Sequence, residues 1–301
     1  MRSCTAVEDV RHEREFDMSI ASSAVLVELN ISVWPANKVD REMTEQVNAN
    51  ASAVRDASQT RKNLFAGTSL RKDIEKYAAR IRLYHNQHTL PWADKGQRLL
   101  PTKLFMDYKT TMNVYEATFN QMCNNFFAEY PRLVQEAQQH LGTMYKADDY
   151  PPLDEVKLKF GFRKAIDPIP ESGDFRLDVS AQDLEEMREQ YEAKFEERLA
   201  DAMRAPWERL HGVLTAMSEK LADEEGVESK KRYHDSLVTN AQELVELLGK
   251  MNITNDPKLE DARKQLELTM LGADIETIKE SAYVRETMKN RVDAILQKFE
   301  W

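Results

Sequence analysis

The sequence predicts a mainly α-helical α+β protein. Long amphipathic helices are expected to form a bundle or a coiled-coil-like arm beside a small, three-stranded antiparallel sheet. Two observations support this fold class. Apolar residues recur every three or four positions over most of the chain, as they do on the buried face of a helix. Three short stretches instead alternate apolar and polar residues, which is typical of half-buried strands.

The strands are predicted near residues 24–34, 156–163 and 174–179. Together with helical stripes from Leu70 to Tyr84 and from Leu104 to Phe126, they form a predicted domain over residues 18–179. Pro131 is expected to restart the chain into a short helix, because proline lacks the amide donor that a helix interior needs.

Residues 180–301 are predicted to form a second unit, a bundle of long helices. Ser180 and Asp256 are suitable N-caps, and Pro257 suits a first helical turn. Pro206 interrupts the first stripe and predicts a kink or a restart there. Residues 1–17 lack the apolar stretch of a signal peptide and are expected to be a disordered or extraneous extension.

The composition is that of an ordered chain, since 42% of the 301 residues are hydrophobic and 31% are charged. Its two cysteines, Cys4 and Cys123, provide no disulfide framework and suit a reducing cytoplasm. Cys123 lies in an apolar helical stripe and is predicted to be a small buried residue. No apolar run approaches the ~20 residues that span a bilayer, so no membrane association is expected.

The common catalytic and cofactor motifs are missing. The chain contains no GxxxxGK[ST], no GxGxxG after a strand, no GxSxG and no HExxH, and no cofactor is predicted. His85 and His88, three residues apart at a helix end, are weak metal candidates that need a third ligand such as Asp94 or Asp149. A metal-dependent enzyme is therefore one alternative.

The stretch HTLPWADKGQRLLP, residues 88–101, connects two helical stripes. Proline disfavours helical geometry in the residue before it, so Pro91 ends the first helix, and Trp92 is expected to anchor the connection in the core. Hydrogen-bond donors on a rigid connection suit binding better than catalysis. We therefore predict a partner-docking site consisting of Trp92, Asp94, Lys95, Gln97 and Arg98.

Charge is unevenly distributed along the chain. Residues 61–109 hold 11 Lys/Arg and 4 Asp/Glu, a net charge of +7, whereas residues 171–228 hold 7 and 17, a net charge of −10. The basic segment leaves nucleic-acid binding as an alternative, although the whole chain carries −10. Opposite charges also suit docking between copies in a homo-oligomer. The acidic helical surface over 183–228 leaves a further alternative, an inhibitor of a host defence or host enzyme that mimics nucleic-acid charge.

Several stretches, in order, resemble an uncharacterised family of bacteriophage and plasmid proteins: VLVELNISVWPANKVD, NLFAG, TLPWADKGQRLLP, LGTMYKADDYPP, SGDFRLDV and MNITNDPKLE. The resemblance extends from Met18 to the C-terminus. Members are often encoded beside a MoxR/CobS-like AAA+ ATPase and sometimes a von Willebrand A protein. The resemblance therefore implies a non-enzymatic phage accessory or assembly protein in the cytoplasm of the infected bacterium, with such an ATPase or von Willebrand A protein as its partner. It supplies no catalytic residues.

Overall fold

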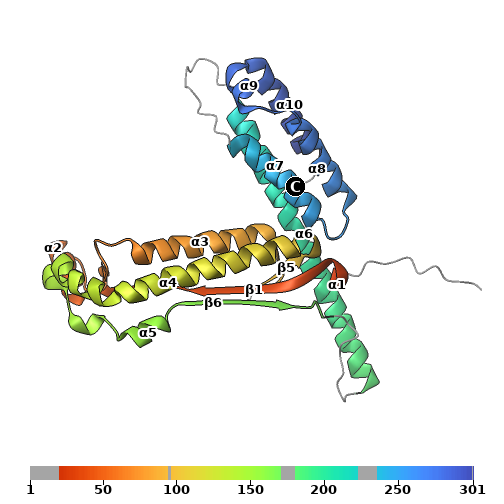
Figure 1. Cartoon of the computed structure of the whole chain (residues 1–301). Helices are drawn as coiled ribbons and strands as arrows, with labels where there is room; N and C mark the ends of the chain where they lie inside the picture. Colours follow the sequence, from red (N-terminus) through yellow and green to blue (C-terminus); the bar gives the residue numbers. More distant parts are fainter. Residues whose placement is uncertain (1–19, 94–95, 171–179, 223–235, 300) are drawn as a thin grey trace, which may run out of the picture.

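The computed structural model describes residues 20–93, 96–170, 180–222, 236–299 and 301. It confirms a mainly helical α+β protein with long helices. Figure 1 shows a sheet lobe, residues 20–170, and a helical lobe, residues 180–299, joined along one long helix. The N-terminal extension, residues 94–95 and the strand predicted at 174–179 lie outside the described residues.

Among the described residues the main sheet has four antiparallel strands, whereas three strands were predicted in all. Their order is β4 (Leu90–Pro91), β5 (Gln97–Pro101), β1 (Ala24–Ser32) and β6 (Gly161–Asp167). A short helix, α1 (Ile20–Ser23), precedes β1. The strand predicted at 156–163 begins five residues later. Val156 is instead buried in α5 (Leu153–Lys157), because Pro152 with Asp154 and Glu155 forms a good helix start.

One face of the sheet is covered by two antiparallel helices, α3 (Leu70–His88) and α4 (Phe105–Leu141). Arg82 of α3 donates to the carbonyl of Ile31 in β1 at 2.7 Å. Lys164 of β6 reaches Glu116 of α4 at 2.7 Å, and Phe162 packs against Phe119. Even-numbered residues of β6 therefore face α4, while odd-numbered ones face away from it.

α4 is one helix of 37 residues, so the predicted restart at Pro131 is wrong. Pro131 lies on the exposed side of α4, while its neighbours Tyr130 and Leu133 are buried. The buried stripe on both sides of the proline is continuous, and its packing outweighs the loss of one helical hydrogen bond. The 3₁₀ turn η1 (Thr102–Leu104) leads into α4.

A small second sheet lies at the far end of the sheet lobe. It pairs β2 (Asn37–Val39) with β3 (Arg61–Asn63), and α2 (Arg41–Asn50) lies between these strands in the chain. Asp40 caps α2 by accepting a hydrogen bond from the Met43 amide. Two 3₁₀ turns, η2 (Gly142–Met144) and η3 (Ala147–Asp149), follow α4 at this end.

The helical lobe consists of α6 (Ala181–Leu221), α7 (Ser236–Met251), α8 (Pro257–Met270), α9 (Ile275–Glu280) and α10 (Ala282–Lys298). The predicted caps are confirmed, since Ser180 accepts from the Asp183 amide and Asp256 from the Lys258 amide. Pro206 does not restart the chain, because it lies inside α6, a single helix of 41 residues. None of the described helices is both long and apolar enough to cross a membrane.

The described residues form two hydrophobic cores, and α6 contributes to both. Ala202 belongs to the core of the sheet lobe, whereas Leu210 and Leu214 belong to the core of the helical lobe. Met251 and Ile253, at the end of α7, pack into the sheet-lobe core as well. The end of α3, the middle of α6 and the end of α7 therefore meet at one junction (Figure 1).

Candidate functional site

The C-terminus of α3 lies at the junction between the lobes and carries the two metal candidates, His85 and His88. α3 ends at His88 with Thr89 as its C-cap. The last carbonyls of a helix have no partners inside the helix and attract cations. Arg98 of β5 meets this need, because its Nε donates to Thr89 Oγ1 at 2.6 Å and its Nη2 to the Thr89 carbonyl at 3.1 Å.

A second arginine, Arg209 of α6, reaches the same helix end from the other lobe. Its Nη1 donates to the Gln87 carbonyl at 2.6 Å, and its Nη2 to the Asn86 carbonyl at 2.7 Å. Burial lowers the pKa of Arg98, and burial followed by repulsion from Arg98 lowers the pKa of Arg209. Two guanidinium groups thus satisfy one helix end, and the α3 dipole offsets their charge.

The two metal candidates face different partners. His85 is buried, with its Nδ1 2.7 Å from the hydroxyl of Tyr108. His88 stacks on Tyr84, and its Nδ1 donates to the Tyr84 carbonyl at 2.8 Å. Burial lowers the pKa of His85 to about 4 and also lowers the pKa of His88, so both rings are neutral at pH 7.

The proposed third ligands do not complete a metal site in the part of the chain that the structure describes. Asp94 lies outside it, and Asp149 belongs to η3, where it faces Lys62 rather than either histidine. No group of three or more His, Cys, Asp or Glu side chains that could hold a metal ion occurs among the described residues.

Trp92 and Gln97, two further predicted docking residues, lie in the hairpin that β4 and β5 form. Trp92 is buried, as expected, and its ring packs against Phe195 of α6 with 5.2 Å between centroids. Gln97 begins β5 and pairs with Glu28 of β1. Asp94 and Lys95 lie outside the described residues. The connection between α3 and α4 is therefore a β-hairpin that packs against α6, and its docking role stays a prediction.

A cleft of about 700 Å³ opens beside this junction. Its walls come from both lobes, from the end of α3 and the start of α4 on one side and from α6 and α7 on the other. The apolar part of the lining consists of Leu104, Val213, Leu244 and Leu247. Asp107, Glu243, Glu246 and Lys250 supply charges, and Lys250 lies 2.7 Å from Glu246. Its mixture of apolar and charged residues is typical of a binding surface.

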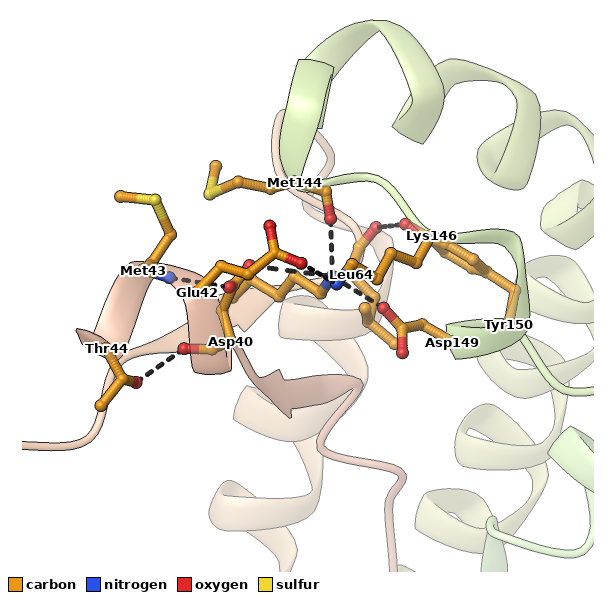
Figure 2. A network of polar contacts seen from close by, with 10 residues as sticks. Asp40, Glu42, Met43, Thr44, Leu64, Met144, Lys146, Asp149 and Tyr150 are labelled. Carbon is orange, nitrogen blue, oxygen red and sulfur yellow. Dashed lines mark hydrogen bonds and ion pairs between the residues drawn. The ribbon is translucent and has the colours of Figure 1, made fainter. Parts of the chain in front are cut away.

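A second polar cluster, at the opposite end of the sheet lobe, centres on Lys62, and Figure 2 labels its partners Asp40, Met144 and Asp149. The Lys62 Nζ donates to the Met144 carbonyl at 2.6 Å and lies 2.8 Å from Asp149 Oδ2 and 3.9 Å from Asp40 Oδ2. The Lys62 side chain is only 3% exposed. The approach to Asp149 Oδ2 is an ion pair without hydrogen-bond alignment, and this oxygen has no hydrogen-bond partner among the described residues.

The contacts around Lys62 fasten β3 and α2 to the turns after α4. Lys146 pairs with Glu42 at 2.7 Å, and the Tyr150 hydroxyl donates to the Leu64 carbonyl at 2.8 Å. A buried cation between carboxylates favours one arrangement of these elements, because its charge is compensated only when all its partners are in place. The contacts of this cluster therefore hold these elements together.

Fewer cations of the basic segment 61–109 are free to bind nucleic acid than its net charge indicates. Lys62 is buried, Arg82 and Arg98 donate to backbone carbonyls, and Arg71 pairs with Glu75 at 2.9 Å. The cations that remain exposed along α3 include Lys72, Lys76 and Arg80. Several Lys and Arg side chains of this segment therefore stabilise the fold.

Arg209 is a residue of this junction that the sequence did not indicate, because nothing local separates it from other charges on a long helix. The chain matches no protein-family model, no curated protein and no solved structure. The junction therefore has to be interpreted from its own geometry.

Proposed function

We propose that this protein is a non-enzymatic accessory or assembly factor that acts by binding another protein in the junction cleft. The observation that carries the proposal is the cleft itself, about 700 Å³ in volume and built from both lobes. The polar groups beside it already serve the fold, since Arg98 and Arg209 hold the end of α3 and His85 pairs with Tyr108. The cleft itself has apolar residues at its base and charged residues at its edge, as protein-binding surfaces usually do.

The partner that we propose is a MoxR/CobS-like AAA+ ATPase, or the von Willebrand A protein encoded with it, in the cytoplasm of a phage-infected bacterium. The support for this choice is the resemblance of the sequence stretches given above. The cleft supports a protein partner of either kind, and the test below separates the site from the choice of partner.

Gly212 allows the cleft to be filled without straining α6. It lines the cleft, and a Cβ added there meets no atom within 4 Å. Gly212→Trp places an indole in the cleft, whereas Gly212→Ala changes the same position without filling it. Ala117→Trp, on an exposed position of α4, is the control for adding a tryptophan. Each variant is used to capture the co-expressed ATPase or the von Willebrand A protein.

We expect Gly212→Trp to lose capture while Gly212→Ala and Ala117→Trp keep it. Capture by all three variants would remove the cleft from the account but leave the partner in place. No capture by the wild-type protein would exclude these two partners. Circular dichroism of the four proteins verifies that they remain equally helical.

A further inference from the structure

In the part of the chain that the structure describes, β6 is an edge strand of the main sheet. It pairs with β1 along its full length, and no other strand of the described chain pairs with it. The five residues from Arg163 to Asp167 are all exposed, and Ile166 is 42% exposed. An edge strand of this kind presents a row of unpaired backbone donors and acceptors, which is a template for another strand.

The sequence of β6, GFRKAID, is complementary to itself when two copies run antiparallel about Ala165. In that register Arg163 of each copy lies opposite Asp167 of the other, and Ala165 lies opposite Ala165. Opposite charges directly across a pair of strands attract, and like charges repel. Arg163, Ala165 and Asp167 all lie on the face away from α4, because Phe162 and Lys164 face that helix.

We propose that β6 binds β6 of a second copy of this chain across a two-fold axis at Ala165, joining the two sheets into one. The interface is isologous, so each favourable contact occurs twice. Lys164, which would lie opposite Ile166 of the other copy, is already neutralised by Glu116 at 2.7 Å. Its methylene groups cover Ile166 without bringing two free cations together.

The second copy fits this edge better than an unrelated strand does. Charged residues on an edge strand normally prevent pairing, because most partners leave them unmatched. Here the antiparallel register about Ala165 matches Arg163 with Asp167 at both ends, and a shift by one residue removes both matches. This surface is independent of the junction cleft, which lies beside α6 and α7.

The test is a charge-swap series on the full-length chain, measured by sedimentation equilibrium. Arg163→Asp places Asp opposite Asp at both ends, and Asp167→Arg places Arg opposite Arg. Each substitution is expected to raise the dimer dissociation constant on the order of tenfold or more. An equimolar mixture of the two variants pairs Asp with Arg at both ends and is expected to recover wild-type affinity as a heterodimer. Arg291→Asp, an exposed reversal on α10, is the control.

A dimer in the wild-type protein that each single reversal weakens and the mixture restores supports the proposal. A wild-type protein that stays monomeric at every concentration overturns it, as do single reversals that leave dimerisation unchanged. A mixture that fails to recover affinity overturns this register. The double variant Arg163→Asp with Asp167→Arg repeats the rescue within one chain, so loss of folding in one single variant does not remove the test.

Discussion

Arg98 and Arg209 belong to different lobes and donate to the same acceptor, the backbone carbonyl of Thr89, each at 3.1 Å. In the structure neither guanidinium forms an ion pair with a described carboxylate. Their positive charges instead face the C-terminal end of α3, where the helix dipole is negative. The lobes are therefore joined by contacts between cations and carbonyls, which lose less strength in salt than exposed ion pairs do.

Arg209→Met tests how much this contact stabilises the protein. The change keeps helix propensity and removes charged hydrogen bonds to three carbonyls, those of Asn86, Gln87 and Thr89. Urea unfolding is expected to show a loss of about 1–3 kcal/mol. Arg204→Met on the same helix, whose side chain is 73% exposed, is expected to change stability by less than about 0.5 kcal/mol. Equal effects of the two variants would contradict a junction held by Arg209.

Lys62→Met tests the buried cluster of Figure 2. The substitution leaves the carboxylates of Asp149 and Asp40 in the interior without their cation, and their side chains are only 15% and 4% exposed. Removing one partner of a buried ion pair is expected to destabilise the fold by about 3–5 kcal/mol in chemical unfolding.

Adding Asp149→Asn to Lys62→Met removes one uncompensated charge and is expected to recover part of this loss. Lys38→Met, at an exposed position of β2, is the matched control and is expected to be nearly neutral. If Lys62→Met were no more harmful than Lys38→Met, the cluster would contribute little to stability.

His85 makes stability depend on pH in a defined window. Burial lowers its pKa in the folded protein to about 4, below the ordinary value of 6.5. Between these values the unfolded chain binds a proton that the folded chain does not, so stability is lost as the pH falls from about 6.5 to about 4. The contribution of His85 is on the order of 2–3 kcal/mol.

His85→Asn removes the titrating group and keeps a polar atom for Tyr108. The free energy of unfolding of this variant is expected to fall less between pH 7 and pH 4 than that of the wild-type protein, as measured in urea at several pH values. His211→Asn, at an exposed position, is the control. A wild-type slope in His85→Asn would show that the buried imidazole does not govern this window.

Cys123 is expected to be inert in the folded protein. The residue is 4% exposed, and burial raises the pKa of its thiol to about 12. The thiolate is the reactive form, so a disulfide reagent is expected to label Cys123 at pH 8 only as fast as the protein unfolds. The measurement uses Cys4→Ser, which leaves one thiol, in buffer and in urea. Fast labelling in buffer would show that α4 opens locally.

The sequence predicted those parts of the fold that depend on local signals. Helix caps and apolar stripes depend on residues that are close together in the sequence. The structure confirms the caps at Ser180 and Asp256 and the apolar stripes of the long helices. β4 and β5 were missed because each contains a proline and the last three residues of β5 are all buried, without alternation. Burial on both faces removes the period of two that marks a strand.

The site was harder to predict for a physical reason. The local sequence located the end of α3 and the buried Trp92, both of which depend on nearby residues. It gave no indication that Arg98 turns toward Thr89 or that Arg209, more than a hundred positions away, meets it there. Such long-range pairings follow from the packing of the lobes, and no spacing within a single helix encodes them.

The length of α6 means that a partner bound to one lobe can exert force on the other lobe. It is a continuous helix of 41 residues, about 60 Å long at 1.5 Å per residue. Because Ala202 and Leu210 are held in different cores, a sideways force on its first turns reaches the other lobe as a torque. Arg209 lies between these two parts of α6 and is hydrogen-bonded to the end of α3, so such a force also acts on these hydrogen bonds.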